Sequence, residues 1–281
     1  MTSGTWDLGC KVNWTLEVLG RRADGFHELR SWFLWLDGGD QLGWEPGPTQ
    51  LSVTGPDAAG VPADPRNLVL RADTAWREAG GIAPSLAWTL AKRLPAGSGL
   101  GAGSADAAGV LRILECSASQ PLGQGRCVQI AAALGSDVPF FLGQASAQLL
   151  GGRGEILLGE QQITDQTVVL AIPQAMAATP AVFAAFCAPD WNEGAREAIP
   201  FPSQPQGNQL EEPAVQVVPE LAKIREALRS LAPFQLSGSG AAWFCPQPAS
   251  QAHALAEAVR ALGLRAQVHR CWSGYPAEVQ S

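Results

Sequence analysis

The stretch Pro95-Ala-Gly-Ser-Gly-Leu-Gly-Ala-Gly-Ser-Ala-Asp-Ala-Ala108 decides the fold of this chain. Glycine stands at every second position from Gly97 to Gly103, so the backbone can turn tightly and approach a ligand closely. Ser104 is a good N-cap, and the alanines and aliphatic residues after it predict a helix. A helix N-terminus presents unpaired N–H groups and a positive dipole end to the loop before it. The stretch therefore predicts an anion site, best suited to phosphate.

Three generic interpretations of this glycine-rich loop compete. A Walker loop needs a lysine before its Ser or Thr, but Ser104-Ala105 follows the last glycine directly, so that interpretation fails. A dinucleotide fingerprint fits Gly97-x-Gly99-x-x-Ala102, but it also needs an acidic residue at the end of a second strand. Glu115 instead lies at the end of the predicted helix itself. A flexible Gly/Ser linker conflicts with the apolar segments on both sides of the loop.

Composition limits the classes of protein to which the chain can belong. Its 281 residues are 46% hydrophobic, enough for one large or two smaller domains. The net charge of −7 argues against a general nucleic-acid or membrane-surface role, and no obligate protein partner is evident. The six cysteines stand singly, which suits reduced thiols and does not favour zinc. With neither a leader pattern nor a long apolar run in the sequence, we expect a cytoplasmic protein.

Apolar and polar residues alternate from Lys11 to Leu19, which predicts a single strand. Val12, Trp14, Leu16 and Val18 share one face, and Lys11, Asn13, Thr15 and Glu17 share the other. On alternation alone, Lys11 is an exposed strand lysine, and His27 is an ordinary surface or core histidine. A basic turn follows at 20–25, and a second strand is predicted over 31–36.

The rest of the chain alternates helical and extended segments. Strands are predicted over 50–53, 86–90, 145–150, 155–158, 168–172, 234–237, 241–245 and 264–270. Helices are predicted over 67–78, 104–116, 127–134, 222–231 and 249–262, with further helices starting at Asn208 and at Thr179-Pro180, a cap followed by a first-turn proline. Residues 188–207 form a polar loop that we expect to be disordered. The first domain should close near residue 160, giving domains 1–160 and 161–281.

The glycine loop resembles the phosphate-binding motif of the small-molecule kinases that include galactokinase, homoserine kinase and mevalonate kinase, the GHMP kinases. Their pattern is Pro-x-x-x-Gly-Leu-Gly-x-Gly-Ser-Ser/Ala, and Ala105 stands where many members carry a second serine. The residues that match, and that the resemblance assigns to ATP, are Pro95, Ala96, Gly97, Ser98, Gly99, Leu100, Gly101, Ala102, Gly103, Ser104 and Ala105. The resemblance implies an α+β fold of two domains with the active site in the cleft between them. The N-terminal domain would be ribosomal-S5-like α/β, and the C-terminal domain ferredoxin-like α/β.

Three further strings resemble one branch of these enzymes, the 4-diphosphocytidyl-2-C-methyl-D-erythritol kinases of the non-mevalonate isoprenoid route. They are Lys11-Val-Asn13, Gly20-Arg-Arg-Ala-Asp-Gly-Phe-His-Glu-Leu29, and Phe33 with Leu36-Asp37. The branch usually has tyrosine where this chain has Phe26, which keeps an aromatic face but lacks the hydroxyl. The resemblance implies phosphorylation of the 2-hydroxyl of a cytidyl methylerythritol by ATP. Another small alcohol, such as mevalonate or homoserine, and a non-catalytic nucleotide-binding role remain the alternatives.

The same resemblance implies the roles of single residues. Asp137, in Gly135-Ser-Asp-Val-Pro139, would be the catalytic base, although by itself it passes for a turn or capping carboxylate. Lys11 would keep Asp137 ionised and stabilise the attacking oxygen, and Asn13, two residues on, would help to place the substrate. The remaining substrate-binding residues would be Phe26 and Phe183 on either side of the cytosine, His27 on its polar edge, Thr179, and Gly238 with Ser239 of a third motif. Mg²⁺ is expected with ATP, with Ser104 as a candidate ligand and no clear acidic one.

Overall fold

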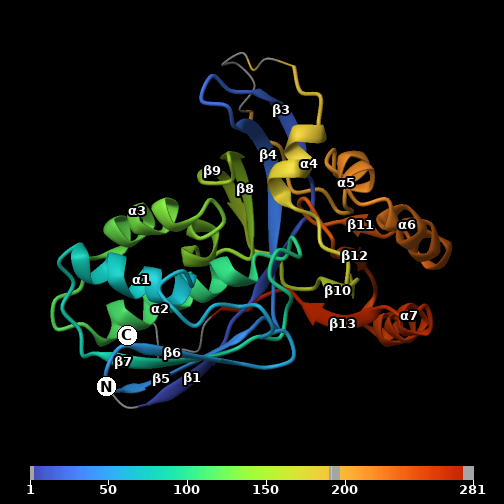
Figure 1. The fold of residues 1–281 in the computed structure, drawn as a ribbon. Helices are drawn as coiled ribbons and strands as arrows, with labels where there is room; N and C mark the ends of the chain where they lie inside the picture. Colours follow the sequence, from blue (N-terminus) through green and yellow to red (C-terminus); the bar gives the residue numbers. More distant parts are fainter. Residues whose placement is uncertain (1–2, 190, 192–196, 275–281) are drawn as a thin grey trace.

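The computed structural model describes residues 3–189, 191 and 197–274, and it arranges them in three sheets flanked by helices (Figure 1). In the first sheet β6 runs parallel to β7 and the other pairs are antiparallel. Its strand order is β1 (Gly4–Asp7), β5 (Gln41–Pro46), β7 (Leu86–Ala91) and β6 (Gln50–Thr54). The helices beside it are α1 (Leu68–Glu78), α2 (Ala102–Ser117) and α3 (Gln124–Leu134).

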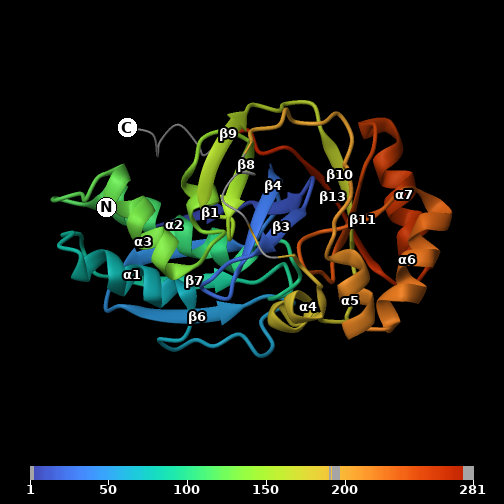
Figure 2. The ribbon, with the colours of Figure 1, turned by 90° about the horizontal axis from the view of Figure 1, so that it is seen from above.

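The second sheet is antiparallel and lies between the two halves of the molecule (Figure 2). Its strand order is β2 (Cys10–Asn13), β4 (His27–Leu36), β8 (Ala147–Gly152) and β9 (Ile156–Gln161), with β3 (Glu17–Arg21) pairing with β4. A short 3-10 helix, η1 (Pro139–Leu142), follows Asp137. The β3–β4 turn and the β8–β9 turn both lie at the upper end of this sheet (Figure 1).

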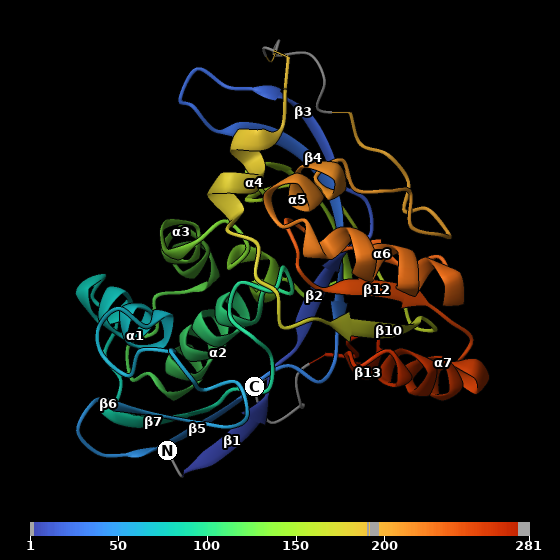
Figure 3. The ribbon, with the colours of Figure 1, turned by 45° about the vertical axis from the view of Figure 1, so that its right-hand side comes forward.

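The third sheet is antiparallel and belongs to the second half of the chain. Its strand order is β11 (Gln235–Leu236), β12 (Trp243–Pro246), β10 (Thr167–Ile172) and β13 (Arg265–Arg270). The helices gathered along it are α4 (Thr179–Ala185), α5 (Glu211–Val217), α6 (Glu220–Leu231) and α7 (Ala249–Ala261) (Figure 3).

Three hydrophobic clusters hold these layers together. One fills the space between the first sheet and α1–α3, and a second packs the third sheet against α4–α7. The third joins residues such as Val12 and Leu34 of the second sheet to Leu170 and Phe244 of the third. The two halves therefore share a continuous apolar core. Sheet membership changes between β9 and β10, and the domain boundary near residue 160 stays a prediction.

Most predicted elements are present, but the strand over Lys11–Leu19 is wrong as a single strand. It divides into β2 and β3, and every residue from Cys10 to Leu16 is buried. Alternation predicts that the polar face of the strand is exposed to solvent. Here the glycine loop and the turn after β11 cover that face. A polar residue on a strand is therefore no sign of exposure where another segment packs over it.

Two predicted helix caps are also wrong. The helix after the glycine loop begins at Ala102, and Gly101, with φ of 68°, is its N-cap, so Ser104 lies inside the first turn. Because Gly101 adopts the left-handed turn that precedes the helix, the helix starts three residues before the predicted position. At α4 the N-cap is Ala178, and the Thr179 hydroxyl pairs with the Ser239 hydroxyl at 2.7 Å instead. The helix predicted over 67–78 is present as α1, and Asn67 is its N-cap, because its side chain accepts a hydrogen bond from Val69 N at 2.9 Å.

The disorder expected over 188–207 falls partly on positions 190 and 192–196, which lie outside the described residues. Further along that loop, Phe201 stacks on Trp14 with ring centroids 5.4 Å apart. Among the helices that the structure describes, none combines the length and the apolarity that crossing a membrane requires.

Candidate active site

The glycine loop lies against the turn after β11, 138 residues later in the chain. A Cβ atom on Gly99, where φ is 81°, would lie 2.2 Å from the carbonyl oxygen of Ser237, so only glycine fits there. The Ser237 hydroxyl donates a 2.9 Å hydrogen bond to Gly99 O, and Ala242 N donates one of 3.0 Å to Ser98 O. Two segments from opposite halves of the chain thus form one structural unit.

The other side of the loop contacts Lys11. The Lys11 amide donates a 2.8 Å hydrogen bond to Leu100 O, and a Cβ atom on Gly101 would lie 2.9 Å from Lys11 Cγ. Leu100, Ala102 and Ala105 point into the core, so they support the loop. Ala96 and Gly97 are exposed, while Gly103 and Ser104 are partly exposed in the first turn of α2. These exposed groups, with the N-terminus of a 16-residue helix behind them, are the part of the loop that can face a phosphate.

Lys11 and Asp137 approach each other beside this loop. Lys11 Nζ lies 3.6 Å from Asp137 Oδ2, and the lysine side chain is 4% exposed against 26% for the aspartate. Burial lowers the pKa of Lys11, and the charge of Asp137 opposes that change. The ammonium also lies 4.7 Å from the centroid of the Phe33 ring. A buried cation thus stands beside a carboxylate that solvent and substrate can reach.

Asn13 orients the lysine. Its Oδ1 accepts a 2.6 Å hydrogen bond from Lys11 Nζ, and its Nδ2 donates a 2.9 Å bond to Ser31 Oγ. The backbone N–H of Asn13 donates a 3.3 Å hydrogen bond to Ser237 Oγ. A Cβ atom on Gly238 would lie 3.2 Å from Asn13 Oδ1 and 3.4 Å from Lys11 Nζ. The structure therefore brings the predicted Lys11, Asn13, Asp137 and Gly238 into one cluster.

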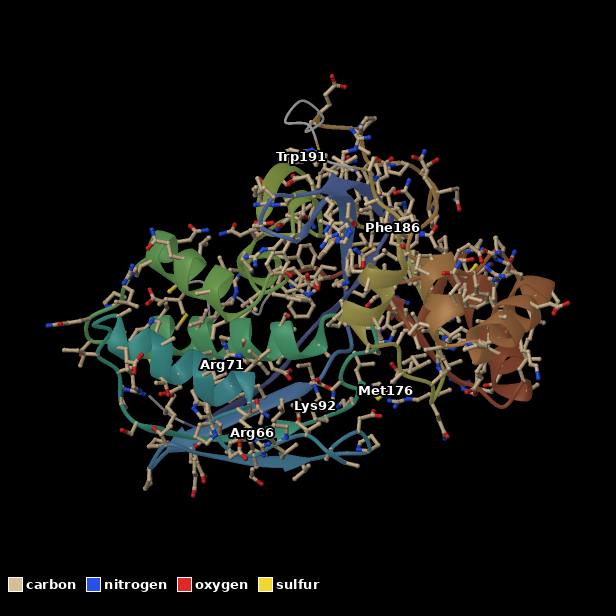
Figure 4. The ribbon with its side chains drawn as sticks, turned by 45° about the horizontal axis from the view of Figure 1, so that its top comes forward. Arg66, Arg71, Lys92, Met176, Phe186 and Trp191 are labelled. Atoms are coloured by element: carbon tan, nitrogen blue, oxygen red, sulfur yellow. The ribbon has the colours of Figure 1, made fainter. Side chains whose placement is uncertain are left out.

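A pocket of about 860 Å³ contains the aromatic residues that were predicted to bind the substrate. Its wall includes Ser136, which precedes Asp137, and the predicted Phe26, His27, Thr179 and Phe183. The hydroxyl of Ser136 also donates a 3.3 Å hydrogen bond to Asp137 Oδ1. Figure 4 shows Phe186, which also lines the pocket, and Met176 on opposite sides of α4, with Met176 on the side of Lys92. The pocket therefore extends from these aromatic side chains to Ser136, which contacts the Asp137 carboxylate.

The aromatic side chains of the pocket already stack on one another. His27 lies over Phe183 with ring centroids 5.2 Å apart and an interplanar angle of 27°, and Phe186 meets its edge. Burial, with the charge of Arg21, lowers the pKa of His27, which favours the neutral imidazole. Phe26 is 52% exposed and lies under the guanidinium of Arg153, at 4.8 Å. The placement of a cytosine between Phe26 and Phe183 stays a prediction.

A buried charge cluster fixes the strand that enters the glycine loop. Lys92, which directly follows β7, donates to Asp40 Oδ2 and, at 3.1 Å, to Asp106 Oδ2 on α2. Asp40 Oδ1 also accepts from the amides of Arg93 at 2.6 Å and Leu94 at 3.0 Å. All three charged side chains are at most 4% exposed. The cluster therefore ties the segment before the loop to the helix after it.

Sequence reasoning missed several residues of this region. Ser136 and Arg153 line the pocket, and Ser237 and Lys92 hold the glycine loop from either side. Arg153 stands in a glycine-rich turn, Gly151-Gly-Arg-Gly154, between two predicted strands, and its charge was the available signal. Lys92 had no such signal, because its partners are 52 and 14 residues away in sequence.

Comparison with known proteins places this geometry in a family. Residues 67–144 match the family described as GHMP kinases N terminal domain. The chain is 42% identical over 246 residues to the 4-diphosphocytidyl-2-C-methyl-D-erythritol kinase of Paracoccus denitrificans, covering 83% of each protein. It is 37% identical over 275 residues to that of Bradyrhizobium diazoefficiens, covering 89% of this chain and 91% of the relative.

Solved structures agree with the sequence relatives. A crystal structure of 4-(cytidine 5′-diphospho)-2C-methyl-D-erythritol kinase superimposes with a TM-score of 0.78 at 32% identity, over 96% of this chain and 100% of the other. A mevalonate kinase structure superimposes with a TM-score of 0.63 at 10% identity, over 95% and 99%, which shows the shared two-domain α+β fold alone. The chain therefore belongs to the 4-diphosphocytidyl-2-C-methyl-D-erythritol kinase family of the GHMP kinases.

Proposed function

We infer that this chain is a small-molecule kinase that transfers the γ-phosphoryl group of ATP to the 2-hydroxyl of 4-(cytidine 5′-diphospho)-2-C-methyl-D-erythritol. The products are ADP and the 2-phosphate, in the non-mevalonate route to isopentenyl diphosphate. The observation that carries this function is the Lys11–Asp137 pair, 3.6 Å apart, in which Lys11 contacts the glycine loop and Asp137 follows Ser136 of the aromatic pocket. Family membership supports the same substrate and phosphate donor.

The proposed mechanism depends on position and charge, because phosphoryl transfer leaves little covalent work for a protein. The N–H groups of the glycine loop and of the first turn of α2 hold the nucleotide phosphates. Asp137 accepts the proton of the attacking hydroxyl as general base. Lys11, held by Asn13 at 2.6 Å, lies beside Asp137 and stabilises the negative charge on the attacking oxygen. The aromatic pocket holds the cytidine end, so that the alcohol reaches Asp137.

Magnesium is proposed to arrive with ATP. Searching the residues that the structure describes finds no group of three or more His, Cys, Asp or Glu side chains able to hold a metal ion. We assign the ion to the nucleotide phosphates, water and the Ser104 hydroxyl.

A coupled ADP-release assay with ATP and Mg²⁺ tests the proposal. It compares the cytidyl methylerythritol substrate with mevalonate and homoserine at equal concentration. Turnover with the cytidyl compound alone is the expected result. Turnover with another alcohol would leave the phosphate loop and Asp137 in place but remove the assignment of the pocket to cytidine. No turnover with all three, in protein shown to be folded, would indicate a non-catalytic nucleotide-binding protein.

A further inference from the structure

Arg153 lies in the pocket wall at a place that the mechanism above does not use. It stands in the turn between β8 and β9, and its guanidinium carbon lies 4.8 Å from the centroid of the Phe26 ring. The side chain is 40% exposed. A guanidinium stacked on an aromatic face is restrained in its plane, while its N–H groups, which lie in that plane, stay available to a ligand.

Among the residues that the structure describes, these N–H groups have few protein partners. The ion pair of the Arg153 side chain is with Glu155, from Nε to Oε1 at 3.7 Å, longer than a hydrogen bond. Glu155 accepts its short bond, 2.6 Å, from the backbone amide of Arg153 instead. The other neighbouring carboxylate, Asp24, accepts from Arg22 Nε and from the Phe26 amide. The guanidinium is therefore positioned but has donors to spare.

The turn that carries Arg153 is held firmly. The buried carboxylate of Glu28 accepts a 2.9 Å hydrogen bond from Gly152 N through one oxygen and a 3.0 Å bond from Arg22 through the other. This carboxylate connects the turn of Arg153 to the turn that carries Phe26 and His27. Because both turns are fixed to one buried group, the distance between the aromatic wall and Arg153 is set by the fold.

The position of Arg153 lies between the two ends of the pocket. Its neighbour Gly154 would place a Cβ atom 3.5 Å from Asp137 Oδ1, whereas its own side chain contacts Phe26 at the aromatic end. Among the described residues that line the pocket, Arg21 and Arg153 carry full charges and there is no carboxylate. Arg21 acts on His27, so it belongs to the base end of the pocket. A ligand that joins a base to an alcohol through phosphates would bring those phosphates to Arg153.

We propose that Arg153 binds the diphosphate of the substrate, using N–H groups that its stacking on Phe26 holds in the pocket wall. This assignment rests on the proposed function, which supplies a diphosphate between cytidine and the alcohol. Arginine suits the task because its planar fork can bond two phosphate oxygens together. The positive charge of Arg153 distinguishes cytidine diphosphate from cytidine. Stacking on the aromatic side chains recognises the base.

The test is calorimetric titration of cytidine, CMP and CDP into the full chain without ATP. We compare the unaltered protein with Arg153→Met and Arg153→Lys. Arg21→Met is the control, because it also removes one positive charge from the pocket wall. We expect CDP to bind more tightly than cytidine, and Arg153→Met to weaken CDP about tenfold or more while cytidine binding is unchanged. Arg153→Lys should keep part of the CDP affinity, and Arg21→Met should keep the ratio of CDP to cytidine affinity.

Three results would overturn the proposal. Equal weakening of cytidine and CDP in Arg153→Met would mean that Arg153 only supports Phe26. The same loss of the CDP-to-cytidine ratio in Arg21→Met would mean that the general charge of the wall, and not Arg153, attracts phosphate. CDP binding no tighter than cytidine in the unaltered protein would remove a diphosphate subsite altogether. None of these results depends on turnover, so failure of the ADP-release assay is a separate finding about the proposed function.

Discussion

The Ser237 hydroxyl donates a 2.9 Å hydrogen bond to the carbonyl oxygen of Gly99, across 138 residues of sequence. The same hydroxyl accepts a hydrogen bond from the backbone N–H of Asn13 at 3.3 Å. One serine therefore contacts both the glycine loop and the strand that carries Lys11. The glycine loop of the first half of the chain is therefore shaped by a residue of the second half. Alignment of the loop with Lys11 depends on the two halves packing together.

Replacing Ser237 with alanine should loosen this junction. The buried Asn13 amide and Gly99 carbonyl each lose a partner, which should lower the free energy of unfolding by about 1–3 kcal/mol. KM for ATP should rise more than KM for the alcohol, because the loop moves and the aromatic pocket does not. Urea unfolding and steady-state kinetics measure both. Ser230→Ala removes an exposed helix hydroxyl and serves as the control; an equal effect of both variants would contradict the role of Ser237.

Replacing Asp137 with asparagine should leave nucleotide binding intact and greatly reduce turnover. The amide has nearly the same shape but cannot accept the proton of the alcohol, so kcat should fall by about 10²–10⁴-fold. ATP affinity, measured by calorimetry, should stay near that of the unaltered protein. Asp7→Asn, which removes an exposed carboxylate that pairs with Arg93, is the control. Activity close to normal in Asp137→Asn would show that another group is the base.

Replacing Phe183 with alanine should weaken the cytidyl substrate selectively. Stacking of a base on an aromatic side chain contributes about 1–3 kcal/mol, so KM for the cytidyl substrate should rise by about fivefold to a hundredfold. Its loss also frees His27, which stacks on Phe183 with ring centroids 5.2 Å apart. KM for ATP should be nearly unchanged. Leu157→Ala, at an exposed apolar residue of β9, is the control. Equal increases in the two KM values would remove Phe183 from the cytidine site.

The buried carboxylates around Lys92 should make stability depend on pH. Burial raises the pKa of Asp106 from its ordinary value of 3.8 to about 7; Lys92 lowers it and Asp40 raises it further. The folded state thus binds this proton more tightly than the unfolded state. The stabilisation from this group is complete below about pH 4 and is lost as the pH rises through about 7.

Replacing Asp106 with asparagine removes this titration. The free energy of unfolding of the unaltered protein should therefore fall, relative to that of Asp106→Asn, between about pH 5 and about pH 8. Urea unfolding of both proteins across that range measures the difference. Asp64→Asn, which changes an exposed carboxylate paired with Arg66, is the control. Its curve of unfolding free energy against pH should run parallel to that of the unaltered protein. If the curve of Asp106→Asn is parallel as well, Asp106 does not titrate in this range.

Local sequence was a good guide to the elements and a weaker guide to their ends. The helix after Asn67 and the strand over Leu86–Ala91 follow from side-chain chemistry and periodicity that act over a few residues. The start of α2 was misplaced because Gly101 and Ser104 can both begin a helix, and the choice depends on how the loop packs against Lys11 and Phe141. A cap is decided by neighbours that the local pattern does not contain.

By itself, the sequence determined that a glycine-rich loop precedes a helix, and its motifs named Lys11, Asp137, His27 and Phe183 as candidates. Only the tertiary structure decided that Lys11 is buried, that Ser237 holds Gly99, and that Arg153 faces the pocket beside Phe26. The physical reason is one of range. Turn geometry and helix propensity act between near neighbours, whereas burial, ion pairing and pocket walls depend on atoms that distant segments bring together.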